Sequence, residues 1–132
     1  MKCKVLVVDD NHTILETVKA MVEFVGHEAL TADGGEACLE QLRGGFRGVI
    51  LMDYVMPELN GFETIKAIVD EGLMEGSVVC MLTGKQEPPE GLEAISEYIL
   101  DYIRKPFSMA ELISIIEMPM SYLETEEEEE VS

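Results

Sequence analysis

The sequence has no tryptophan, only nine lysine and arginine residues against 27 acidic ones, and no apolar run long enough to cross a bilayer. The shortage of basic residues leaves a formal net charge of -18. Nucleic acids and anionic membranes are bound through basic surfaces, so this composition argues against both as partners. The amino terminus also lacks the long apolar stretch of a signal peptide. We therefore expect a cytoplasmic protein with no nucleic acid and no membrane among its partners.

Cysteine is scarce as well. The three cysteines, Cys3, Cys38 and Cys80, are odd in number, scattered, and form no CxxC pair. This pattern favours neither a disulfide framework nor a zinc site. A chain of 132 residues with 47% hydrophobic residues can form one domain with a core of its own. We expect that domain at residues 1–122 and a disordered acidic tail at 123–132, because six glutamates lie among the last nine residues.

Apolar runs typical of strands alternate with segments of helical periodicity along the chain. Three of the helical segments follow pairs with the spacing of a capping box, in which a polar cap precedes a glutamate by three residues: Asp33 with Glu36, Asn60 with Glu63, and Ser108 with Glu111. The pattern predicts a (βα)5 chain with a parallel five-stranded sheet and helices on both faces. The expected strands are 4–9, 28–32, 48–53, 78–83 and a segment within 98–104.

Reactive or ion-binding side chains lie at the ends of four of these strands. They are Asp9 and Asp10, Asp53, Thr83, and Lys105. In an open parallel sheet the carboxyl ends of the strands form one edge, where ligands bind, so these groups are expected to converge. Clustered carboxylates repel unless protons or a cation neutralise them, and magnesium accepts carboxylate oxygens and phosphate oxygens together. A carboxylate between a cation and a lysine can attack phosphorus and give an aspartyl phosphate.

Four sequence motifs coincide with these strand ends: VLVVDDN, ILMDYVMPELNG, MLTGK and RKPF. Together they resemble the receiver domain of two-component response regulators, in the short, stand-alone form of the chemotaxis regulators. The resemblance runs from Lys4 to about Glu117. It implies a flavodoxin-like, doubly wound α/β fold with strand order 2-1-3-4-5.

The resemblance also implies roles for single residues. Asp53 would be the phosphorylated residue, and Asp9, Asp10, Asp53 and the backbone carbonyl of Val55 would surround Mg²⁺, or Mn²⁺ in its place.

Three further roles follow from the same resemblance. Thr83 and Lys105 would contact the phosphoryl group, Tyr102 would be the switch aromatic, and the peptide bond before Pro106 would be cis.

The implied function is that of a signalling domain and not of an enzyme, with self-catalysed phosphotransfer and autodephosphorylation only. The phosphoryl donor would be a histidine kinase or a histidine phosphotransfer protein. The signal would pass to an unknown protein target through the face formed by the fourth helix, fifth strand and fifth helix. Because no output domain is evident in the sequence, we expect action by docking, and homodimerisation on activation stays open.

Simpler interpretations exist for each residue taken alone. Asp10 and Asn11 are good helix caps, and Asp53 could form a turn before a proline. Thr83 could be a plain strand residue, Lys105 a surface lysine and Tyr102 a half-buried strand aromatic.

Other functions also stay open. A receiver-like adaptor could signal without phosphorylation. A hydrolase with an aspartyl phosphate intermediate would need a second acid where Val55 stands. A flavin-binding electron carrier would need a phosphate-binding loop where Asp9 and Asp10 would repel a phosphate.

Overall fold

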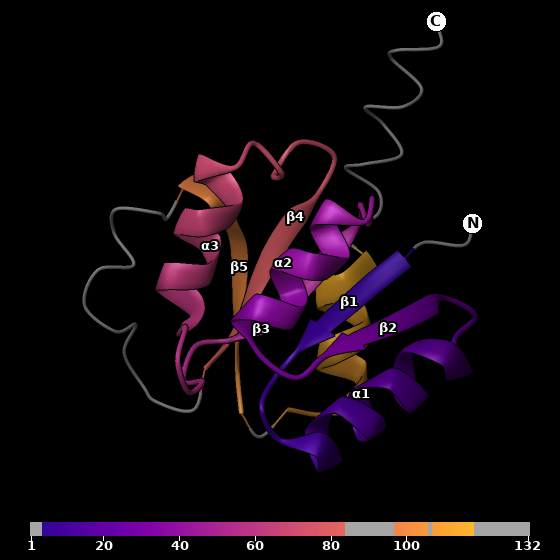
Figure 1. Ribbon diagram of the computed structural model, residues 1–132. Coiled ribbons are helices and arrows are strands. Elements are labelled where there is room, and N and C mark those ends of the chain that lie inside the picture. Colours follow the sequence, from indigo (N-terminus) through magenta and orange to yellow (C-terminus); the bar gives the residue numbers. More distant parts are fainter. Residues whose placement is uncertain (1–3, 84–96, 106, 118–132) are drawn as a thin grey trace, which may run out of the picture.

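A computed structural model describes residues 4–83, 97–105 and 107–117 of the chain. Its centre is a five-stranded sheet in the order β2-β1-β3-β4-β5, and every neighbouring pair is parallel (Figure 1). The strands are β1 Lys4–Val8, β2 Glu28–Ala32, β3 Val49–Asp53, β4 Val78–Thr83 and β5 Ile99–Arg104. The predicted sheet and its strand order are thereby confirmed.

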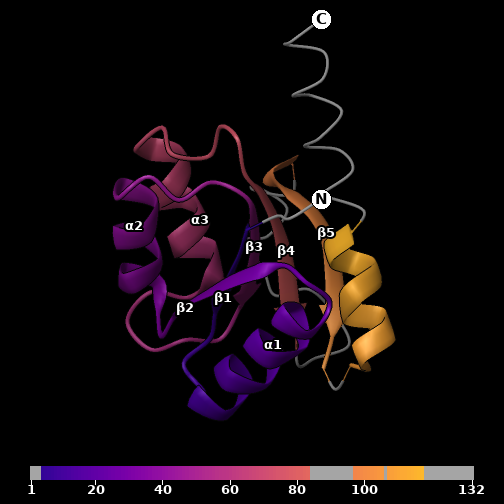
Figure 2. The ribbon, with the colours of Figure 1, turned by 90° about the vertical axis from the view of Figure 1, so that its right-hand side faces the viewer.

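Helices cover both faces of the sheet. They are α1 His12–Phe24, α2 Gly35–Arg43, α3 Gly61–Asp70 and a helix at residues 109–117. Figure 2 shows α2 and α3 on one side of the sheet, with α1 and the 109–117 helix on the other. None of the described helices is long and apolar enough to span a membrane. The expected fourth helix and the acidic tail lie outside the described residues.

Each face of the sheet has its own apolar core. On the side of α2 and α3, Leu6 and Ile50 pack with Ile65 and Ile68. On the side of α1, the core includes Val7 and Leu51 together with residues of the 109–117 helix. The central strands β1 and β3 contribute buried side chains to both cores, which explains why their sequences are apolar without alternation.

Helix starts agree with the sequence in two of three cases. Asn60 and Glu63 form a capping box at α3, and Ser108 and Glu111 exchange the equivalent hydrogen bonds. The prediction for Asp33 is wrong, because α2 begins one residue later than that cap requires. Its N-cap is Gly34, and no side chain caps the helix.

The start of α2 is set by packing against α3. A Cβ placed on Gly35 would meet Thr64 Oγ1 and would lie 2.8 Å from Leu59 Cβ. Close approach to α3 therefore fixes where α2 begins, and this contact cannot be inferred from the spacing of Asp33 and Glu36.

Candidate functional site

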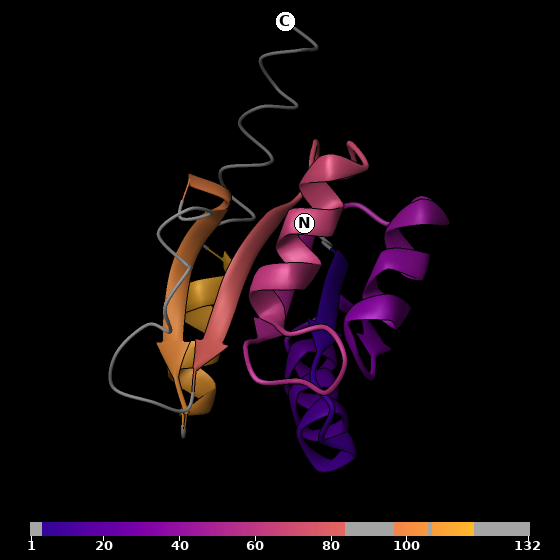
Figure 3. The ribbon, with the colours of Figure 1, turned by 60° about the vertical axis from the view of Figure 1, so that its left-hand side comes forward.

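The site lies at the carboxyl edge of the sheet. The strands point the same way, so that β4 and β5 end side by side in Figure 3. In the register of β1 and β3, Val8 is opposite Met52. Asp9, which follows β1, therefore lies beside Asp53, the last residue of β3.

Three carboxylates gather at this edge, as the sequence predicts. Asp9, Asp10 and Asp53 each offer a carboxylate oxygen, and these oxygens lie within 4.8 Å of one another. Asp9 is 1% exposed and Asp53 7%, whereas Asp10 is open to solvent. Two of the three acidic side chains are thus largely removed from water, where a negative charge without a partner is costly.

Lys105 provides the positive charge nearest to this cluster in the described part of the chain. Its Nζ lies 2.7 Å from Asp9 Oδ2 and 3.2 Å from Asp53 Oδ1. Lys105 follows β5, and its ammonium thus joins the carboxylates that follow β1 and end β3. One ammonium against three carboxylates leaves a formal charge of -2 at the site.

Burial and mutual repulsion shape the ionisation of these groups. Burial, together with the charge of Asp9, raises the pKa of Asp53, and Lys105 opposes that rise only in part. Burial disfavours the ammonium of Lys105 as well, but its hydrogen bond to Asp9 and the charge of Asp53 outweigh that effect and raise its pKa. Lys105 therefore stays charged, while Asp53 carries an ionisation penalty that further positive charge would relieve.

The turn after β1 holds Asp9 in place. The backbone N–H of Asn11 donates to Asp9 Oδ1 at 2.9 Å. The side chain of Asn11 in turn accepts from the N–H groups of Thr13 and Ile14 and caps α1. Capping is therefore the role of Asn11, and Asp10 is the exposed member of the carboxylate cluster.

The loop after β3 packs tightly against Asp53. The N–H of Gly61 donates to the carbonyl of Tyr54 at 2.8 Å. A Cβ on Gly61 would lie 2.7 Å from Met81 Cε and 3.1 Å from the carbonyl oxygen of Asp53. The glycine at the start of α3 thus allows the helix to pack directly against the backbone of Asp53, the candidate phosphoacceptor. Within the same loop Val55 is 67% exposed.

The donor set fits a divalent cation. All three side chains offer carboxylate oxygens, which magnesium and manganese accept as ligands. One such ion would neutralise the excess negative charge of the cluster. A candidate cation site of this kind is what the spacing of Asp9, Asp10 and Asp53 predicts.

Other predicted site residues are placed less fully. Thr83 ends β4 and is paired with Arg104 of β5, but its side chain lies outside the described part. Pro106 also lies outside the described residues. Tyr102 on β5 is 39% exposed.

Comparison with known proteins agrees with the fold. The family model of the response regulator receiver domain matches residues 5–117 of the sequence. The chain is 30% identical over 131 residues to the phosphate regulon transcriptional regulatory protein PhoB of Klebsiella pneumoniae, covering 99% of this chain and 57% of that protein. It is 30% identical over 113 residues to protein PilH of Pseudomonas aeruginosa, covering 86% of this chain and 93% of PilH.

A solved structure gives the same result. The CheY-like response regulator receiver domain protein of Methanospirillum hungatei JF-1 superposes with a TM-score of 0.88 at 36% identity, over 92% of this chain and 97% of that one. The chain therefore spans little more than half of PhoB but nearly all of PilH and of this solved domain.

Proposed function

The chain belongs to the response regulator receiver domain family, and on that premise we propose that it accepts a phosphoryl group on Asp53 in a magnesium-dependent reaction. A receiver domain is a signalling phosphoacceptor and not a classical enzyme, and membership of the family implies a histidine kinase as partner. The finer proposal is that the phosphoryl group comes from such a kinase or from a histidine phosphotransfer protein.

The observation that supports this proposal most is the placement of Asp53 between Lys105 and two further carboxylates. Its Oδ1 lies 3.2 Å from Lys105 Nζ, and its neighbours Asp9 and Asp10 complete a cluster with excess negative charge. When bound by Asp9, Asp10, Asp53 and the carbonyl of Val55, a divalent cation would supply charge that stabilises the phosphoryl oxygens.

In the proposed transfer a carboxylate oxygen of Asp53 attacks the phosphorus atom. A bond forms between that oxygen and phosphorus, and the bond from phosphorus to the nitrogen of the donor histidine breaks. The donor imidazole leaves with the electron pair. Asp53 must be ionised to attack, and Lys105 favours the ionised form against the effect of burial.

Lys105 and Thr83 would bind the phosphoryl group once it is in place. The ammonium of Lys105 already lies within hydrogen-bond distance of Asp53, so it needs only a short movement to contact an oxygen attached there. Thr83 ends β4 next to β5, and its hydroxyl would provide one further hydrogen bond.

We assign the output to the face that includes β5 and the 109–117 helix. Tyr102 lies on β5, two positions before the residue paired with Thr83. A shift of Thr83 toward a phosphoryl oxygen would change the space available to the Tyr102 ring and so change this face. One hydrogen bond contributes roughly 0.5 to 1.5 kcal/mol, which is enough to shift the balance between states that are both already populated.

Acetyl phosphate provides the test of phosphorylation. The full chain is incubated with acetyl phosphate and Mg²⁺, and its intact mass is measured. We expect the mass of one phosphoryl group to be added in the parent protein, and no addition in Asp53→Asn or in the presence of a chelator. Equal phosphorylation of Asp53→Asn and parent would refute the assignment of the acceptor.

A further inference from the structure

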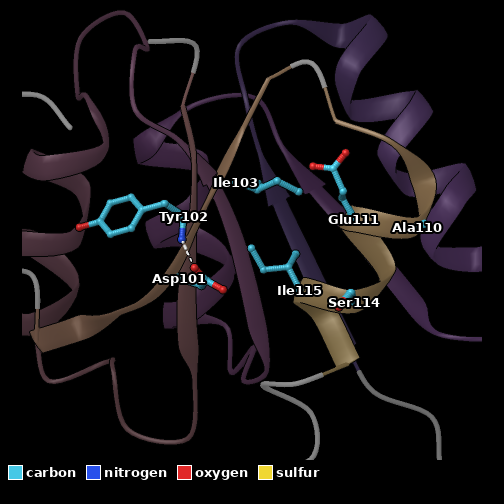
Figure 4. A pocket seen from close by; sticks show the side chains of 7 residues that line it. All are labelled: Asp101, Tyr102, Ile103, Ala110, Glu111, Ser114 and Ile115. Carbon is cyan, nitrogen blue, oxygen red and sulfur yellow. Dashed lines mark hydrogen bonds between the residues drawn. The ribbon is translucent and has the colours of Figure 1, made fainter. Parts of the chain in front are cut away.

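A hollow of about 430 Å³ lies between β5 and the 109–117 helix, away from the acidic cluster. Figure 4 shows its lining. Ile103 and Ile115 form a buried apolar floor, and Asp101, Glu111 and Ser114 stand at an exposed rim, while the ring of Tyr102 points away from this floor. Its volume falls in the range of binding pockets, which is roughly 300 to 1,000 Å³.

Both acidic residues of the rim lack a positively charged partner among the described residues. Asp101 Oδ1 accepts from the backbone N–H of Tyr102 at 2.8 Å, and Glu111 Oε1 accepts from the N–H of Ser108 at 3.3 Å. The ion pairs of the described chain belong instead to Arg43 and Lys105. Two carboxylates thus border an apolar floor, and each has one oxygen held by a neighbouring N–H.

The adjoining edge of the sheet is not arranged to accept another strand at this point. β5 is an edge strand, but the N–H of Tyr102 is bonded to Asp101. A hydrogen-bond donor of that edge is therefore already used, which disfavours pairing with a strand of another protein here. A side chain of a partner protein can enter the hollow without pairing to this edge.

We propose that this hollow binds a lysine or arginine side chain presented by a partner protein. Such a side chain has an aliphatic stem and a cationic end. The stem would pack on Ile103 and Ile115, while the ammonium or guanidinium would be attracted by the carboxylates of Asp101 and Glu111, which border the hollow from opposite ends. This proposal rests on the proposed function only in that the same face carries the output. It predicts that the unknown target presents a basic residue flanked by apolar residues.

Two other occupants fit the hollow less well. A second copy of the chain carries the same excess of acidic residues, so charge repulsion disfavours its approach to an acidic rim. A divalent cation would find only these two carboxylates, whereas the cluster with three acidic ligands in the described chain is that of Asp9, Asp10 and Asp53. The combination of apolar floor and acidic rim is complementary to a basic side chain with a long stem.

The test uses the full ¹⁵N-labelled chain, unphosphorylated and without divalent cations. It is titrated with acetyl-leucyl-arginyl-leucine amide, and amide shifts are followed by NMR. The peptide in which citrulline replaces arginine has nearly the same shape without the charge. We expect shifts centred on Asp101, Ile103, Ser114 and Ile115 with the arginine peptide, and much weaker ones with the citrulline peptide.

Matched variants separate the hollow from the general acidity of the chain. The double variant Asp101→Asn with Glu111→Gln keeps the acceptor atoms of both local hydrogen bonds, and we expect the arginine peptide to bind about five- to tenfold more weakly. Asp33→Asn with Glu40→Gln removes the same charge from exposed positions elsewhere and should leave the affinity unchanged.

Three results would overturn the proposal. They are equal affinity of the parent and the Asp101, Glu111 variant, an equal loss in the control variant, and concentration-dependent shifts at the hollow without peptide, which would identify a second copy as the occupant. Phosphorylation of the same samples by acetyl phosphate is an independent readout. A parent that binds the peptide but takes no phosphoryl group would refute the proposed function alone, and the reverse result would refute the hollow alone.

Discussion

Lys105 forms an ion pair with Asp9, with Nζ 2.7 Å from Oδ2, although 96 positions of sequence separate the two residues. Because Asp9 is almost completely buried, its carboxylate depends on that ammonium for neutralisation. The same ammonium contacts Asp53. Lys105 therefore stabilises the site before any phosphoryl group arrives, in addition to the role in binding phosphoryl oxygens that we propose for it.

Replacement of Lys105 should destabilise the protein when divalent cations are absent. Lys105→Met keeps the length of the side chain but leaves Asp9 and Asp53 buried without a positive partner. We expect the free energy of unfolding in a chelator to fall by about 2 kcal/mol, measured by denaturant titration. Lys66→Met, at an exposed lysine of α3, is the matched control and should change little. Equal stability of both variants would show that the ion pairs contribute nothing.

Replacement of Asp53 should have the opposite effect on stability. An unfolded aspartate titrates near pH 3.9, as a rough reference. Because the pKa of Asp53 is raised by burial and by Asp9, the folded protein binds the proton more tightly than the unfolded one. The contribution of Asp53 to the free energy of unfolding therefore falls as the pH rises from the pKa of Asp53 in the unfolded chain to its pKa in the folded protein.

At a pH above both pKa values Asp53 is ionised in the folded protein, and the full cost of burying its charge is present. Asp53→Asn removes that cost. We expect the variant to be more stable than the parent by roughly 1 kcal/mol at neutral pH in a chelator, and the difference to vanish in acid below both pKa values. Thermal unfolding across a pH series measures both. A variant less stable than the parent at neutral pH would contradict the raised pKa, and Asp70→Asn on the exposed end of α3 is the control.

Gly61 should be intolerant of a side chain. A Cβ there would press on Met81 Cε and on the carbonyl of Asp53, so Gly61→Ala should cost about 2 kcal/mol and displace the phosphoacceptor. Gly44→Ala is the control, because its Cβ would lie at an ordinary 3.4 Å from the carbonyl oxygen of Glu40. Stability and the rate of phosphorylation by acetyl phosphate are both measured. Equal behaviour of the two variants would show that α3 can retreat from Asp53 without loss.

Thr83 should matter for the readout more than for phosphorylation. Thr83→Ala is expected to accept the phosphoryl group on Asp53 but to lose much of the coupling to Tyr102. Beryllofluoride, a phosphoryl mimic, provides the test by NMR chemical shifts. Equal shifts around Tyr102 in the parent and in Thr83→Ala would show that the threonine does not relay the signal.

The sheet could be predicted because β1, β3 and β4 are apolar, largely buried runs that lead directly to Asp9, Asp53 and Thr83. The convergence of Asp9 and Asp53 follows from parallel strands alone. The direct contact of Lys105 with Asp9 was not predicted, because the convergence of strand ends places both residues at one edge without indicating which carboxylate the ammonium contacts. The start of α2 was mispredicted from Asp33, since the contact of Gly35 with α3 decides it.

The hollow beside β5 was not predicted either. Its residues come from two elements whose spacing depends on how the helix packs on the sheet, and the pairing of β4 with β5 shifts register between Val79 and Cys80. Neither the helix packing nor the register shift can be inferred from the local pattern of apolar residues. The acidic character of Asp101 and Glu111 was visible in the sequence, but not that both would border the same apolar floor.

The most direct test of the central claim is chemical location of the phosphoryl group. After incubation with acetyl phosphate and Mg²⁺, the protein is treated with borohydride, which reduces an acyl phosphate to an alcohol, and its peptides are sequenced by mass spectrometry. The account predicts homoserine at position 53 in the parent, and none when a chelator is present. Reduction at Asp9, at Asp10 or at no aspartate would contradict it.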